Sequence, residues 1–92
     1  MKEVSVKTFE ELVKIINEDP PSAIEFRKGN FSYSFGVNPE HKLCYAKVRL
    51  VDHFYKPSSE EEYKEFDSEK EFFEFMKKKF EEIKPEKVIF FY

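Results

Sequence analysis

The sequence lacks tryptophan and glutamine, and its 92 residues include one cysteine, two glycines and two alanines. The single cysteine, Cys44, excludes an internal disulfide and fits a reducing compartment. The glycines stand alone, so no glycine-rich loop before a helix indicates a nucleotide enzyme. No apolar run approaches the ~20 residues of a membrane-spanning helix, and the N-terminus has no apolar signal-peptide run. We therefore expect a cytoplasmic protein without a membrane segment.

Aromatic and charged residues, by contrast, are abundant in the sequence. Twelve phenylalanines and five tyrosines make up most of the apolar material, and charged residues account for 38% of the chain. Each buried aromatic side chain removes about 150–250 Å² from water, so a few can build the core of a single domain spanning 1–92. The Lys/Glu bias matches proteins of hot environments, and an AT-rich genome would also enrich several of these residues. The net charge of −3 provides no general attraction to nucleic acid.

Two helices are predicted, each by a capping signature followed by an apolar face. Thr8 and Glu11 form a capping box for the first helix, and Asp19-Pro20-Pro21 ends it. Asp67 or Ser68 caps the second helix, and a proline ends it. The residues on the two apolar faces are Phe9, Leu12, Val13 and Ile16, then Phe72, Phe73, Met76, Phe80 and Ile83.

Alternating apolar and polar residues predict the strands. They are expected at 4–6, 23–27, 31–37, 42–54 and 87–92. The first is short, and a turn at 28–30 joins the next two into a hairpin. The order (β)-α-β-β-β-α-β predicts an α+β fold: a two-layer, mostly antiparallel sheet of four or five strands with two helices on one face. The acidic segment 55–67 is expected to be a mobile connection.

The pleat of the strands divides their residues between a face against the helices and an open face. The residues expected against the helices are Ile24, Phe26, Phe31, Tyr33, Phe35, Val37, Cys44, Ala46, Val48 and Leu50. Those expected on the open face are Glu25, Arg27, Ser32, Ser34, Tyr45, Lys47, Arg49, Val51 and His53.

The apolar C-terminal strand suggests a function. Its residues Val88, Ile89, Phe90, Phe91 and Tyr92 show no alternation, so the strand is either covered on both sides or covered by a second copy of the chain. We expect a non-enzymatic interaction module that forms a homo-oligomer, in the simplest case a dimer, through this strand and the open face. A protein partner is the other possible occupant. Phe75, just off the main stripe of its helix, is expected to flank the core.

The alternative function is nucleic-acid or anion binding by the open face. Platforms of this kind pair basic residues for phosphates with aromatic rings for bases. The candidate residues are Arg27, Tyr45, Lys47, Arg49 and His53.

The chemistry of an enzyme has weaker support. On an extended strand Cys44 and His53 lie ~30 Å apart and point to opposite faces, so they form neither a dyad nor a zinc site, with or without His41. The many carboxylates leave a metal-dependent hydrolase or nuclease as a second alternative, with no acid–base pair distinguished among them. No catalytic residue, metal site or cofactor is predicted, and no family motif is legible.

Overall fold

The computed structural model describes residues 1–51 and 54–92, with side chains described outside 51–60. Within these residues the chain forms one antiparallel sheet of six strands and two helices. The elements are β1 (Lys2–Val4), α1 (Phe9–Glu18), β2 (Ala23–Lys28), β3 (Phe31–Val37), β4 (Leu43–Val51), β5 (Phe54–Phe66), α2 (Glu69–Ile83) and β6 (Lys87–Phe91). The predicted α+β class is confirmed, with one strand more than expected.

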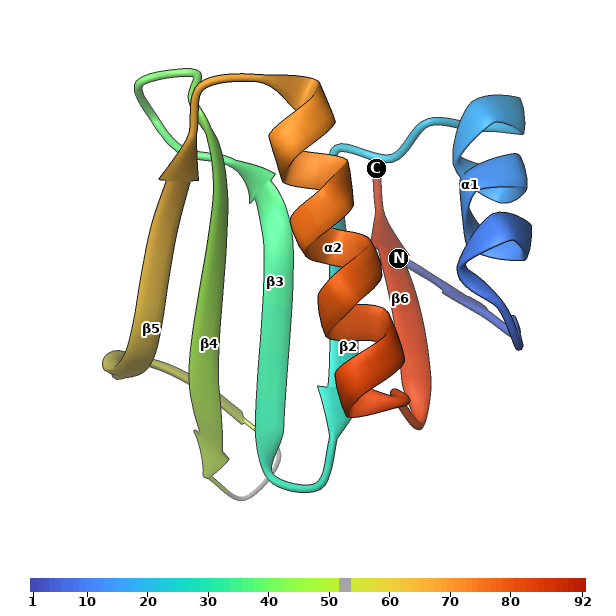
Figure 1. The fold of residues 1–92 in the computed structure, drawn as a ribbon. Helices are drawn as coiled ribbons and strands as arrows, with labels where there is room; N and C mark the ends of the chain where they lie inside the picture. Colours follow the sequence, from blue (N-terminus) through green and yellow to red (C-terminus); the bar gives the residue numbers. More distant parts are fainter. Residues whose placement is uncertain (52–53) are drawn as a thin grey trace.

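Both helices cover one face of the sheet (Figure 1), and the strand order β1-β6-β2-β3-β4-β5 explains why each of them is a crossover connection. β1 and β2 are each antiparallel to β6, so they run parallel to one another and need a crossover connection, which α1 provides. The same argument applies to β5 and β6, which α2 connects. α2 thereby carries the chain from the β5 edge back to a position between β1 and β2.

The helix caps follow the prediction with one difference. The Thr8 hydroxyl accepts from the amide of Glu11 at 3.2 Å, and the Ser68 hydroxyl accepts from the amide of Glu71 at 3.2 Å. The Glu11 carboxylate accepts from the amide of Lys7 at 3.3 Å, one residue before the amide that a capping box would satisfy. Lys84 ends α2 in the left-handed conformation, with φ of 50°.

The core lies between the helices and one face of the sheet. Its buried members are Phe9, Leu12 and Ile16 of α1, Phe72, Met76 and Phe80 of α2, and Ile24, Phe26, Phe35, Tyr45, Phe66, Val88 and Phe90 of the strands. Aromatic rings meet edge to face across the layers, as Phe26 and Phe80 do at 5.6 Å between centroids. Phe75 lies at the flank of this core, as predicted, with its ring 4.9 Å from that of Tyr45.

Two strands depart from the prediction. β1 occupies Lys2–Val4 rather than 4–6. The acidic segment that was expected to connect strand and helix is the edge strand β5, paired with β4. Its pairing has a physical reason, because the Glu61 carboxylate lies beside Lys47 and Arg49 of β4, and the Glu62 carboxylate accepts a hydrogen bond from Tyr45 of β4. Charged residues on an edge strand also disfavour pairing with a further chain.

The faces of β4 are the reverse of those predicted. Phe35 pairs directly with Tyr45, and directly opposed residues of an antiparallel ladder share a face. Tyr45, Lys47 and Arg49 therefore lie on the helix side of the sheet. The even-numbered residues that were expected there lie on the opposite, open face: Cys44, Ala46, Val48 and Leu50. Val48 is nevertheless fully buried on that side, so the open face is not exposed along its whole length. Apolar side chains occur on both sides of β4, so its own alternation did not decide between them.

Candidate basic–aromatic surface

The residues that were predicted to bind an anion together do not share one face of the sheet. Arg27 lies on the open face of β2 and forms an ion pair with Glu25. Tyr45, Lys47 and Arg49 lie on the opposite, helix-bearing face. His53 lies outside the described residues. The predicted open-face platform is therefore not assembled, and its β4 residues have other neighbours.

Those neighbours include two aromatic rings of β3. Phe31 pairs with Arg49, and Tyr33 pairs with Lys47. The Lys47 ammonium lies 4.4 Å from the Phe31 ring centroid and 5.6 Å from that of Tyr33, and the Arg49 guanidinium carbon lies 5.0 Å from the Phe31 centroid. A cation over a ring face at these distances is attracted by the ring quadrupole. Phe31 and Tyr33 are partly exposed, so the group is open to solvent.

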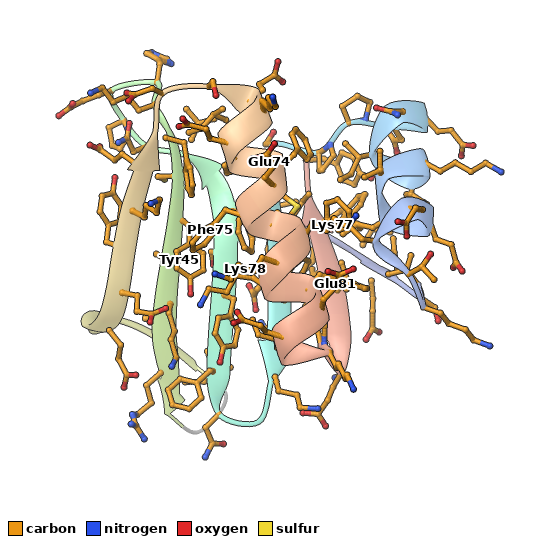
Figure 2. All side chains as sticks on the ribbon, in the orientation of Figure 1. Tyr45, Glu74, Phe75, Lys77, Lys78 and Glu81 are labelled. Carbon is orange, nitrogen blue, oxygen red and sulfur yellow. The ribbon has the colours of Figure 1, made fainter. Side chains whose placement is uncertain are left out.

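Tyr45 is a buried core residue in the same region. Its ring is 2% exposed and packs against Phe35 and Phe75 at 5.1 and 4.9 Å between centroids. Figure 2 shows Tyr45 and Phe75 together beside α2. The Tyr45 hydroxyl donates to the Glu62 carboxylate at 2.6 Å. Burial, and then this bond, raise the pKa of Tyr45. Because its ring is buried, Tyr45 offers no stacking face to a ligand.

Two further lysines extend the cationic region. Lys64 of β5 lies 5.5 Å from the Phe66 ring centroid and 5.6 Å from that of Phe75. Lys79 of α2 lies 5.6 Å from the Tyr45 centroid. We call the set formed by Phe31, Tyr33, Lys47, Arg49, Lys64 and Lys79 the basic–aromatic surface, which lies around the buried Tyr45.

Carboxylates partly neutralise this surface. Glu61 lies within 3.8 Å of the Lys47 ammonium and 3.1 Å of the Arg49 guanidinium. Glu62 lies 3.8 Å from Lys79. The hydrogen bond from Tyr45 lowers the pKa of Glu62, so that carboxylate remains ionised. An incoming anion would meet cations that already have partners.

The C-terminal strand is an interior strand, paired with β1 on one side and β2 on the other. Val88 and Phe90 face the helices and are 3% and 0% exposed. Ile89 faces the opposite side and is only 5% exposed, between Glu3 of β1 and Glu25 of β2. Coverage on both sides within one copy thus accounts for the missing alternation.

The open face has a shallow centre of small side chains. Ala23, Ser34, Gly36, Cys44 and Ala46 meet there, all partly exposed. A Cβ added at Gly36 would lie 3.2 Å from that of Ala23, so the two strands approach closely at this point. Phe91 on β6 and Tyr63 on β5 lie on the same face at either side.

Metal and membrane sites were sought in the part of the chain that the structure describes. No group of three or more His, Cys, Asp or Glu side chains is close enough to hold a metal ion there. Neither helix there has the length and apolar character needed to cross a bilayer. Cys44 lies on the open face, and His41 lies in the turn before β4 with φ of 64°.

Comparison with known proteins assigns no family. No protein-family model matches the chain, and neither the curated proteins nor the solved structures contain a significant match.

The sequence missed four members of the surface: Phe31, Tyr33, Lys64 and Lys79. The two aromatic residues were assigned to the core because they alternate with serines on β3, and the lysines lie on elements that are distant in sequence. The register of the β3–β4 hairpin could have indicated that Phe31 and Tyr33 share a face with the β4 cations. If the connection at 38–42 is closed as a turn, Phe35 faces Tyr45, and Phe31 then faces Arg49.

Proposed function

We propose that this protein is a non-enzymatic binding module whose basic–aromatic surface binds a single-stranded nucleic acid. The observation that carries the proposal is the placement of Lys47 and Arg49 over the Phe31 ring, with Tyr33 beside it. Single-strand platforms combine cations for the backbone phosphates with ring faces on which bases stack. β4 and β5, which carry Lys47, Arg49 and Lys64, lie to the side of α2 toward the edge of the sheet (Figure 1).

The partner's chemistry follows from the surface. Rings accept any base, so we expect little sequence preference. The neighbouring carboxylates and the net charge of −3 weaken attraction to polyanions in general, so we expect binding that is modest and strongly dependent on salt. A duplex presents its bases only as edges and would use the cations alone.

Fluorescence anisotropy with a labelled 12-nucleotide oligothymidylate, about 12 phosphate charges long, tests the proposal at low salt. The double variant Lys47→Glu with Arg49→Glu should bind at least about tenfold more weakly. The matched control, Lys2→Glu with Lys14→Glu, has the same change in net charge on β1 and α1. The control should lose much less affinity.

A second variant separates stacking from charge. Phe31→Ala removes one ring and should weaken binding by about 1–3 kcal/mol while leaving the salt dependence unchanged. Absence of binding at low salt by the wild type and by variants with fewer carboxylates on the surface would refute the proposal. An equal loss in the two charge-reversed doubles would do so as well.

A second candidate function is self-association through the open face. The small side chains at its centre make the face flat, and Phe91 and Tyr63 lie partly exposed on either side. Flat sheet faces pack against one another about 10 Å apart. Of the C-terminal strand, Phe91 would contribute from this face, since Val88, Ile89 and Phe90 are buried within one copy.

Size-exclusion chromatography with light scattering tests this candidate. If the protein is a homodimer, Ala46→Arg should shift its measured mass toward that of a monomer, because it places a long cation at the flat centre of the face. A strict monomer at high micromolar concentration would remove the candidate. The cytoplasmic location expected from the sequence fits either function.

A further inference from the structure

Glu61 reaches the basic–aromatic surface through an irregularity in β5. Lys47 pairs with Glu62 and Val48 pairs with Glu60, so Glu61 is an extra residue with no partner across the ladder. In a regular strand its side chain would point to the open face, opposite to Glu62. A bulge redirects the side chain of its extra residue. Here the result is a carboxylate beside two cations on the helix side.

The contacts of this carboxylate resemble those of a bound anion. One Glu61 oxygen accepts from the Arg49 Nε at 3.2 Å and from its Nη2 at 3.1 Å. The other oxygen lies 3.8 Å from the Lys47 Nζ. Both cations lie over the ring of Phe31. Arginine recognises carboxylates and phosphates with the same fork of donors.

We infer that the Glu61 carboxylate occupies the position of a phosphate group of the ligand and competes with it from within the chain. The inference rests on the proposed function and adds its regulation. A phosphate of a single strand reaches Lys47 and Arg49 only when Glu61 leaves them. When Lys47 and Arg49 turn toward the phosphate, the Phe31 ring that they cover becomes the stacking face for the adjacent base.

The exposures of the three side chains permit this exchange. The Arg49 side chain is 55% exposed, that of Glu61 33% and that of Lys47 23%. Ion pairs that are open to solvent contribute little net stability. Glu61 can therefore swing away without unfolding the strand. Tyr45, which anchors Glu62 from the buried side, does not contact Glu61 through any described hydrogen bond.

The test measures oligothymidylate affinity of Glu61→Gln against wild type and a matched control. Glu3→Gln provides the control, because it removes the same charge from an exposed strand residue at the other end of the sheet. Glu61→Gln should bind at least about threefold more tightly than Glu3→Gln. Its plot of log affinity against log salt should steepen by about 0.7 for each additional phosphate contact.

Equal affinities for Glu61→Gln and Glu3→Gln would overturn the inference while leaving the binding function intact. Failure of the wild type and both variants to bind would instead refute the function itself. If Glu61→Gln does not fold, Glu61→Asp is measured instead, because it keeps the charge but moves the carboxylate away from the cations by one methylene. Tighter binding by Glu61→Asp supports the competition, and unchanged binding overturns it.

Discussion

Replacing Tyr45 with alanine tests the reversed faces of β4 most directly. The side chain is 2% exposed, between Phe35 below and Phe75 above, and its hydroxyl donates to Glu62. On the open face, where the sequence alone placed it, the same ring would be half in water. The two placements predict very different costs.

The cost can be estimated from burial. A buried aromatic side chain removes about 150–250 Å² from water, which at about 25 cal/mol per Å² corresponds to about 4–6 kcal/mol. Residual compactness of the unfolded chain reduces this by about 10–40%. The result, about 3–5 kcal/mol for Tyr45→Ala, agrees with typical aromatic truncations in cores. Tyr45→Phe keeps the ring and should cost about 1–2 kcal/mol, from the lost hydrogen bond to a charged acceptor.

The assay is urea unfolding followed by far-ultraviolet circular dichroism, which suits a small two-state domain without tryptophan. Tyr63→Ala is the matched control, because Tyr63 is on the neighbouring strand and is 48% exposed. Its hydroxyl bonds to Asn38 and Glu65 are solvent-exposed, so the control should cost about 1 kcal/mol or less. Equal costs for the two tyrosines, or a loss below about 1 kcal/mol at Tyr45, would refute the helix-side placement.

Other predictions concern pH and backbone conformation. The hydrogen bond from Tyr45 lowers the folded-state pKa of Glu62, so its stabilisation is complete above the carboxyl's ordinary value of 4.5 and is lost as pH falls through the lower folded value. The difference in urea midpoint between wild type and Tyr45→Phe should therefore shrink as the pH is lowered. A difference that stays constant with pH would contradict this linkage. Gly29 has φ of 59° in the β2–β3 turn, and Gly29→Ala should destabilise by about 1 kcal/mol. Lys84→Gly should instead stabilise by about 0.5–1 kcal/mol, because glycine relieves the left-handed C-cap, and thermal melts that move in the same direction for both would contradict this reasoning.

The position of Glu61 would have been difficult to predict. Its carboxylate reaches Lys47 and Arg49 because β5 contains one residue more than its partner at that point. No local pattern marks the bulge, since Glu60, Glu61 and Glu62 are identical in type. The competition proposed for the surface therefore depends on how two strands align.

The sequence by itself determined the features that depend on local chemistry. Thr8 and Ser68 cap the helices because short polar side chains satisfy free amides, and apolar residues at helical spacing placed Phe72, Met76 and Phe80 in the core. The α+β class follows from the order of these elements.

The tertiary structure alone decided which side of β4 faces the helices and that the acidic segment is a strand. Alternation sorts the residues of one strand into two sets, but only the register with neighbouring strands selects the set that is buried. On β4 both sets contain apolar residues, and α2 makes the choice by packing Phe75 on Tyr45. The long stems of Lys47 and Arg49 can follow Tyr45 to that side because their charged ends still reach water.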